Sequence, residues 1–153
     1  MPADSDNLIP LPHTWKPLGV RIAIYAFGGA LIVVFAAMWI GLGSEIRGHF
    51  TTFQRVTTVF LFLLLFVCYW GLIRSKVTAT EDGLTVVNGF RTHRFEWAQI
   101  ITINLGRGAP WADLDLSDGE TRIVIAIQGS DGARANRAIA HIRALIKAHE
   151  ASV

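Results

Sequence analysis

The sequence predicts an α+β membrane protein, in which a two-helix transmembrane hairpin precedes a curled antiparallel β-sheet closed by a C-terminal helix. Three observations predict this fold class. Two long runs lack charge (22–44 and 56–73), short alternating runs separated by Asp-Gly and Asn-Gly pairs follow, and the C-terminal segment returns to a helical period. We therefore divide the chain into a Pro-rich apolar arm (1–19), a transmembrane hairpin (20–74) and a cytoplasmic domain (75–153).

The composition agrees with a membrane protein that carries a polar domain. Hydrophobic residues make up 52% of the 153 residues, charged residues only 17%, and the mean hydropathy is +0.41. The formal charge of +2 belongs to the first half of the chain, because basic and acidic residues balance in the second half. A neutral domain does not fit nucleic-acid binding, which needs a clustered positive face. The single cysteine, Cys68, excludes an internal disulfide.

The two uncharged runs are long enough to cross a bilayer. As helices they reach about 34 Å and about 27 Å, against a hydrocarbon core of ~30 Å. Neither run has the polar face expected of a helix in a soluble bundle. The first apolar run is too long for a signal peptide, and Asp4 and Asp6 stand where a signal peptide has its basic n-region, so we interpret the run as an uncleaved anchor.

Flanking charges predict the orientation in the inner (plasma) membrane. The connection of residues 45–55 contains two cations, Arg47 and Arg55. Four cations lie at the other end of the hairpin, before the first run and after the second: Lys16, Arg21, Arg74 and Lys76. Because cytoplasmic flanks carry the excess of Lys and Arg, we expect both termini and the domain to be cytoplasmic.

One face of the first span carries small residues, and the arm before it carries prolines. At 100° per residue, the following side chains fall within about 80° of one another: Ala23, Ala26, Ala30, Val34, Ala37 and Gly41. Such a face lets another helix approach closely. We prefer packing against the second span of the same chain; the alternative is docking onto another membrane protein.

The arm contains Pro2, Pro10, Pro12 and Pro17, which prevent a continuous helix. Its apolar residues are Leu8, Ile9, Leu11, Trp15 and Leu18. Two interpretations stay open. The arm either lies extended on the membrane or a partner, with Trp15 as a contact residue, or is an unstructured tail with an incidental Trp anchor.

After Lys76 the pattern alternates with a period of two and is interrupted by Asp82-Gly83, Asn88-Gly89 and Asp118-Gly119, which predict hairpins. Six or so short strands should curl into a sandwich or small barrel. We expect Leu114 and Leu116 to face inward, and Ile123, Ile125 and Ile127 to do the same on the next strand.

Ser130 or Asp131 should cap a final helix from about Ala133 to Glu150. The apolar stripe of this helix consists of Ala135, Ala138, Ile139, Ile142, Leu145 and Ile146. A helix that follows a curled sheet is expected to cover its open end.

The segment from Val77 to Glu150 resembles the bacterial pleckstrin-homology-like (PH-like) domains of actinobacterial membrane proteins. The similar pieces are EDGLTVVNGFRTHRFEWAQI, a Pro-containing loop, LDLSDG, IAIQGSDG and the closing helix. The resemblance implies a curled sheet closed by one helix, typically preceded by two transmembrane helices. These motifs are structural turns, so the resemblance supports the fold more than any activity.

The sequence contains none of the motifs that carry common catalytic or phosphate-binding chemistry. The five histidines lack metal-ligand spacing, and we expect no metal, no cofactor, no small-molecule substrate and no enzymatic activity. The first hairpin carries Glu81 and Asp82, which disfavour an anionic headgroup there. Arg91, His93 and Arg94 form the basic cluster of the domain, and Arg91 and His93, on one face, could contact headgroups or an acidic partner.

These features predict a non-catalytic accessory or assembly subunit of a larger membrane complex. The candidate partner contacts are Trp15, Ala23, Ala26, Ala30, Ala37, Gly41, Arg91 and His93. Resemblance to small actinobacterial accessory proteins makes the respiratory cytochrome bcc–aa3 supercomplex one possible host. The alternative is a membrane-anchored PH-like module that binds lipid headgroups or another ligand.

Overall fold

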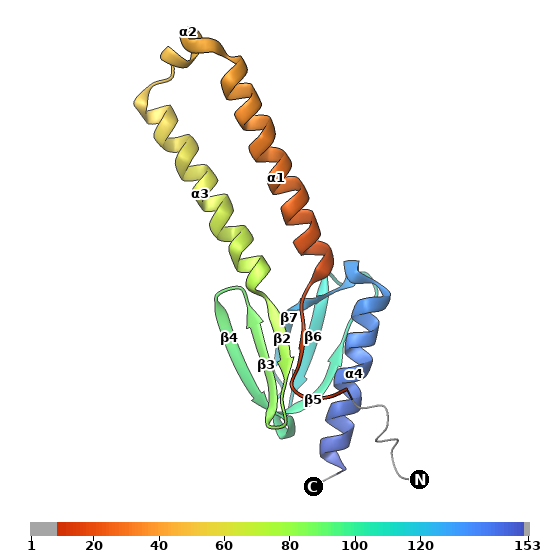
Figure 1. Cartoon of the computed structure of the whole chain (residues 1–153). Helices are drawn as coiled ribbons and strands as arrows, with labels where there is room; N and C mark the ends of the chain where they lie inside the picture. The colour runs from red at the N-terminus through yellow and green to blue at the C-terminus, as the bar shows by residue number, and fades with distance from the viewer. Residues whose placement is uncertain (1–8, 152–153) are drawn as a thin grey trace.

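In the computed structural model, which describes residues 9–151, a helical hairpin stands on one end of a mixed α and β domain (Figure 1). The helices are α1 (Leu18–Gly41), α2 (Gly43–Gly48), α3 (Thr52–Arg74) and α4 (Ala133–Glu150). The strands are β1 (His13–Trp15), β2 (Lys76–Ala79), β3 (Gly83–Asn88), β4 (Arg91–Glu96), β5 (Ile100–Asn104), β6 (Trp111–Leu116) and β7 (Thr121–Gln128). Short 3-10 helices, η2 (Trp97–Gln99) and η3 (Gly129–Asp131), precede β5 and α4.

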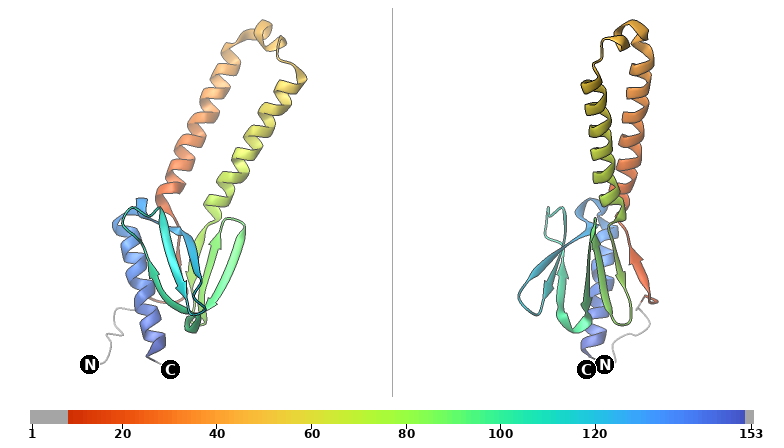
Figure 2. Two further views of the ribbon diagram at one scale, coloured as in Figure 1. Left: turned by 180° about the vertical axis from the view of Figure 1, so that it is seen from behind. Right: turned by 90° about the vertical axis from the view of Figure 1, so that its left-hand side faces the viewer.

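The strands form two antiparallel sheets, β1-β2-β3-β4 and β5-β6-β7, in place of a single closed barrel. The two sheets and α4 enclose one hydrophobic core, and Figure 2 shows α4 beside the sheets in both views. Helix α4 has the predicted bounds, and all six residues of its predicted stripe are buried. The three pairs predicted to mark hairpins, Asp82-Gly83, Asn88-Gly89 and Asp118-Gly119, lie at strand connections.

The arm belongs to the domain. His13 pairs with Ala79 and Trp15 with Val77, so β1 extends the sheet at the edge of β2. Ile9, Leu11 and Trp15 pack against the core. From Ile9 onward the arm is therefore not an unstructured tail, because the edge of β2 binds it. Pro2 and Leu8, also assigned to the arm, lie outside the described residues.

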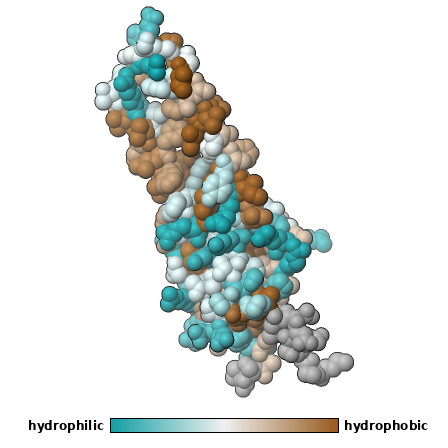
Figure 3. Space-filling view, in the orientation of Figure 1, coloured by the Kyte–Doolittle hydropathy of each residue, from teal (hydrophilic) through white to brown (hydrophobic). Residues whose placement is uncertain are grey.

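Both long helices are apolar and almost wholly exposed. Each is long and apolar enough to cross a membrane, and only 0% and 6% of the most apolar windows of α1 and α3 are buried. Apolar side chains cover the hairpin, whereas hydrophilic ones gather over the domain (Figure 3). Helix α1 begins at Leu18, before the predicted start at residue 22, and ends at Gly41 near Gly43, whose φ is +68°. Helix α3 begins after Thr51, which forms a capping box with Gln54.

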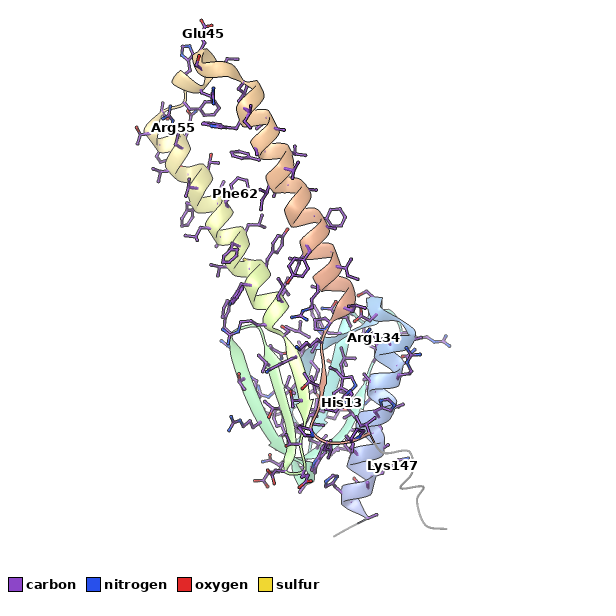
Figure 4. All side chains as sticks on the ribbon, in the orientation of Figure 1. His13, Glu45, Arg55, Phe62, Arg134 and Lys147 are labelled. Atoms are coloured by element: carbon purple, nitrogen blue, oxygen red, sulfur yellow. The ribbon has the colours of Figure 1, made fainter. Side chains whose placement is uncertain are left out.

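Aromatic contacts connect the two helices. The rings of Phe35 and Phe62 meet edge to face with centroids 4.9 Å apart, and Phe62 points toward α1 (Figure 4). Near the loop, Trp39 lies 5.3 Å from Phe50 between ring centroids. Closer to the domain, a Cβ added at Gly28 would lie 3.5 Å from the ring of Tyr69. The side of α1 that faces α3 is therefore defined by Gly28, Phe35 and Trp39.

Two local predictions are correct only in part. Asn88 is the last residue of β3 and pairs with Arg91, so the turn is Gly89-Phe90, and only Gly89 has positive φ (61°). This fits a type II′ turn, which needs glycine first. On β7 Ile127 is buried as predicted, but Ile123 is exposed and Ile125 half-buried, and Val124 and Ala126 are buried in their place. The pairing of β6 with β7 shifts between Trp111 and Ala112, and such an irregularity changes which side chains face the core.

Candidate functional site

The small-residue face of α1 points away from α3. At 100° per residue, its centre lies roughly opposite the side defined by Gly28, Phe35 and Trp39. Ala23 is half-buried, and the other five members are exposed: Ala26, Ala30, Val34, Ala37 and Gly41. The preferred prediction, that this face packs on the second span, is therefore wrong. The face is left open by the part of the chain that the structure describes.

Trp15 is placed by β1 and contributes to the domain itself. Its side chain is half-buried against the core, and its ring lies 4.7 Å from that of His13 between centroids. Trp15 also lines a cavity of about 330 Å³ together with Pro17, Arg21 and Asp131. This position gives Trp15 a structural role in attaching the arm to the domain.

Arg91 and His93 lie on the edge strand β4, apart from the small-residue face of α1. His93 pairs with the buried Val86 and stacks on Phe95 with centroids 6.2 Å apart, so it lies on the core side of the sheet. Arg91 is exposed at the turn. Arg94 points to the opposite, outer face because side chains alternate along a strand. The three basic residues therefore do not form one contact surface.

The domain caps the first apolar helix. Asp131 accepts hydrogen bonds from the backbone N–H groups of Leu18 (3.1 Å) and Gly19 (2.8 Å), which open α1. A carboxylate at this end accepts hydrogen bonds from the free N–H groups, and its negative charge interacts favourably with the positive end of the helix dipole. Asp131 was predicted to cap α4 instead, but the cap position of α4 is Gly132, which makes no side-chain cap.

The end of α3 is attached in a similar way. The buried hydroxyl of Ser75 accepts from Gly89 N–H at 3.0 Å and donates to the carbonyl of Gly71 at 3.3 Å. A Cβ added at Gly71 would lie 3.1 Å from the ring of Phe90, so the β3–β4 turn packs directly on α3. Arg21 joins the two helix ends by donating from Nη2 to the carbonyl of Ile73 at 3.3 Å.

Sequence reasoning missed the junction residues Asp131, Ser75 and Arg21 as a group. Asp131 and Leu18 are separated by most of the chain, and no local pattern reports such a contact. The available signal was Lys16-Pro17 before an uncapped apolar run, since the free N–H groups of a helix that lacks a cap from its own chain segment need an acceptor from elsewhere. Among the described residues, no group of three His, Cys, Asp or Glu side chains could hold a metal ion.

Comparisons with known proteins agree with this architecture. Residues 74–145 match a family model described as bacterial PH domain. Uncharacterized proteins from Mycobacterium bovis and from two strains of Mycobacterium tuberculosis are each 28% identical over 143 residues, covering 92% of this chain and 88% of each relative. Because so little of the chain is left out, the similarity must extend through most of the hairpin as well as the domain. No solved structure matches the chain significantly.

The predicted resemblance to actinobacterial proteins with two apolar helices and a PH-like domain is thereby confirmed. The matched segment begins at the last residue of α3 and ends within α4, so it contains six of the strands and most of the closing helix. The strand β1 and the helices α1 and α2 lie before it. Residues 74–145 thus carry a bacterial PH-like domain, to which the preceding residues add an edge strand and an apolar helical hairpin.

Proposed function

We propose that this chain is a non-catalytic accessory or assembly subunit that docks onto another membrane protein through the small-residue face of α1. The observation that carries the proposal is the direction of this face. It points away from α3, and five of its members are exposed. In lipid, close helix approach depends on small side chains, because hydrophobic burial supplies little drive between helices.

The proposal includes residence of α1 and α3 in the plasma membrane. The exposure of both helices supports it, because exposed apolar surface of this extent needs cover by lipid or protein. β1 before α1 pairs with β2 after α3, so both ends of the hairpin lie on the domain side. The four cations at those ends then favour a cytoplasmic domain and an external α2 loop. Removal of α1 as a signal peptide would also remove β1.

Attachment of the domain to the hairpin base supports a role in assembly. Asp131 binds the start of α1, and Ser75 links the end of α3 to the β3–β4 turn. A partner bound to the hairpin in the membrane therefore also positions the domain. A respiratory complex of the cytochrome bcc–aa3 type is one concrete host that the actinobacterial resemblance suggests. The alternative, headgroup binding through Arg91 and His93, is less favoured because His93 stacks on Phe95 on the core side of the sheet and is half-buried.

The test adds bulk to the face without adding charge. Ala30→Leu combined with Ala37→Leu should reduce co-purification of the host complex in mild detergent by about tenfold, a loss of roughly 1.4 kcal/mol of helix packing. Gly29→Leu is the control, because a Cβ added there meets no atom of the chain within 4 Å and the position lies off the face.

Reporter fusions in the same strains should place residue 50 outside and residue 153 inside. Mass spectrometry of the co-purified proteins identifies the host and tests the bcc–aa3 candidate directly. Equal recovery of the host with the double variant and with the control contradicts docking through this face. A cytoplasmic reporter signal from residue 50 contradicts the orientation.

A further inference from the structure

A basic groove lies where the hairpin meets the domain. Its cavity of about 480 Å³ is lined by five cations from separate segments: Lys16, Arg21, Arg74, Lys76 and Arg94. The remaining lining residues are uncharged, and they include the hydroxyl-bearing Ser75, Thr85 and Thr92. No carboxylate lines the groove, so its local charge differs sharply from the neutral balance of the domain as a whole.

The fold brings these cations together. Lys76 pairs with Val87, and Arg94 pairs with Thr85. Because side chains alternate along β2, β3 and β4, both cations and both of their strand partners lie on the outer face of the sheet. This face forms the floor of the groove. Lys16 follows β1, Arg21 lies near the start of α1 and Arg74 ends α3, and these three close the groove at the base of the hairpin.

The cations of the groove lack anionic partners. In the described part of the chain, the one ion pair within 4 Å joins Arg122 to Glu120, outside the groove. Arg74 lies 6.0 Å from the centre of the Phe90 ring, a contact that leaves its charge uncompensated. Within Arg21, Nη2 reaches the Ile73 carbonyl, while Nε is buried and has no hydrogen-bond partner. Like charges gathered in one cavity repel each other, and a bound anion offsets that repulsion.

The groove lies at the depth of lipid headgroups. Arg21 and Arg74 mark the beginning and the end of the uncharged parts of α1 and α3. In a bilayer spanned by these helices, that level is the interface, where anionic phospholipids present their phosphates. Basic pockets between helix ends on the cytoplasmic side are suited to such headgroups. The acidic β2–β3 turn with Glu81 and Asp82 is at the far end of the domain's strands and does not line the groove.

We propose that this groove binds the phosphate of an anionic phospholipid headgroup, with Arg21, Lys76 and Arg94 as the principal contacts. The inference rests on the membrane residence of the hairpin in the proposed function, and it is independent of docking through α1. The headgroup acts as a counter-ion that joins the two helix ends to the outer face of β2–β4. A lipid held there fixes the tilt of the domain against the membrane.

The test uses the full chain in nanodiscs of phosphatidylcholine with increasing phosphatidylglycerol. After transfer to neutral detergent, native mass spectrometry counts the phosphatidylglycerol retained by each variant. Lys76→Gln combined with Arg94→Gln should weaken retention by about thirtyfold, since each of the two cations near an anionic surface contributes on the order of 1 kcal/mol. Arg137→Gln with Lys147→Gln, on the exposed side of α4, removes the same charges outside the groove and should leave retention unchanged.

Further arms separate folding and free phosphate from lipid binding. Arg94→Gln alone, at an exposed position, should retain the parent melting temperature while retention falls. Arg94→Lys, which keeps the charge, should retain most of the lipid. Equal retention by groove and control variants overturns the proposal. Binding of inorganic phosphate or glycerol 3-phosphate as tight as that of the lipid overturns the lipid assignment. Insertion reporters for the same variants distinguish loss of lipid binding at this groove, with insertion unchanged, from failure of the hairpin to insert into the membrane.

Discussion

The domain and the hairpin contain the same apolar residue types but place them in opposite surroundings. In the domain, Leu114 and Ile142 are 0% exposed, whereas in the hairpin Leu64 and Phe60 are 50% and 59% exposed. The domain therefore gains stability from burial within its own chain. The hairpin gains little from internal packing, and lipid or another protein must cover it. The structure thus places the buried core in the domain and leaves the apolar surface of the hairpin exposed.

The largest expected effect tests this contrast with one substitution type. Leu114→Ala should destabilise the domain by about 2–5 kcal/mol, because it leaves a cavity in the core. Leu64→Ala removes the same atoms from an exposed site and should change the domain's free energy of unfolding by less than about 0.5 kcal/mol. Urea unfolding of the detergent-solubilised chain, monitored by hydrogen exchange of α4 amides, measures the free energy of unfolding of both variants. Similar losses of unfolding free energy in the two variants would contradict the contrast between a buried domain core and an exposed hairpin.

The contrast also explains which parts of the fold could be predicted. The stripe of α4 was predictable because a helix buried on one side must repeat apolar residues with the helical period. The turns were predictable to within one residue because Asp-Gly and Asn-Gly pairs favour tight turns through their own backbone conformations. In both cases the signal lies within a few residues of the structure that it specifies.

The missed features depend on contacts between distant segments. The pairing of Trp15 with Val77 joins strands on either side of the hairpin, and Asp131 reaches Leu18 across most of the chain. The direction of the small-residue face could not be predicted because neighbouring positions on α1 are apolar all round. Aromatic contacts such as Phe35 with Phe62 decide which side meets α3. The groove cations were recognised only as topology signals, since their convergence with Arg94 requires the strand register.

A smaller effect is expected at the turn that touches the hairpin. Gly89→Val should destabilise the domain by about 1–3 kcal/mol, because Gly89 has φ of 61°, a conformation that β-branched residues rarely adopt. Gly106→Val is the control, since that loop glycine does not have positive φ. Thermal unfolding of the two variants checks the prediction. A melting temperature unchanged by Gly89→Val would mean that the β3–β4 turn relaxes freely.

The smallest expected effect is at the join between the two regions. Asp131→Ala removes the carboxylate that accepts from Leu18 and Gly19, and loss of a helix cap costs about 1 kcal/mol. Because the core is untouched, we expect faster hydrogen exchange at the start of α1 and in β1, with little change in α4. Asp82→Ala, an exposed carboxylate at the β2–β3 turn, is the matched control. Asp131→Asn should give an intermediate result, since an amide oxygen still accepts one hydrogen bond without the charge that opposes the helix dipole. If exchange in α4 rises as much as at α1, the hairpin and the domain unfold as one unit, and their energetic independence is wrong. If exchange at α1 stays at the parent level, another group caps the helix, and the domain does not hold the hairpin through Asp131.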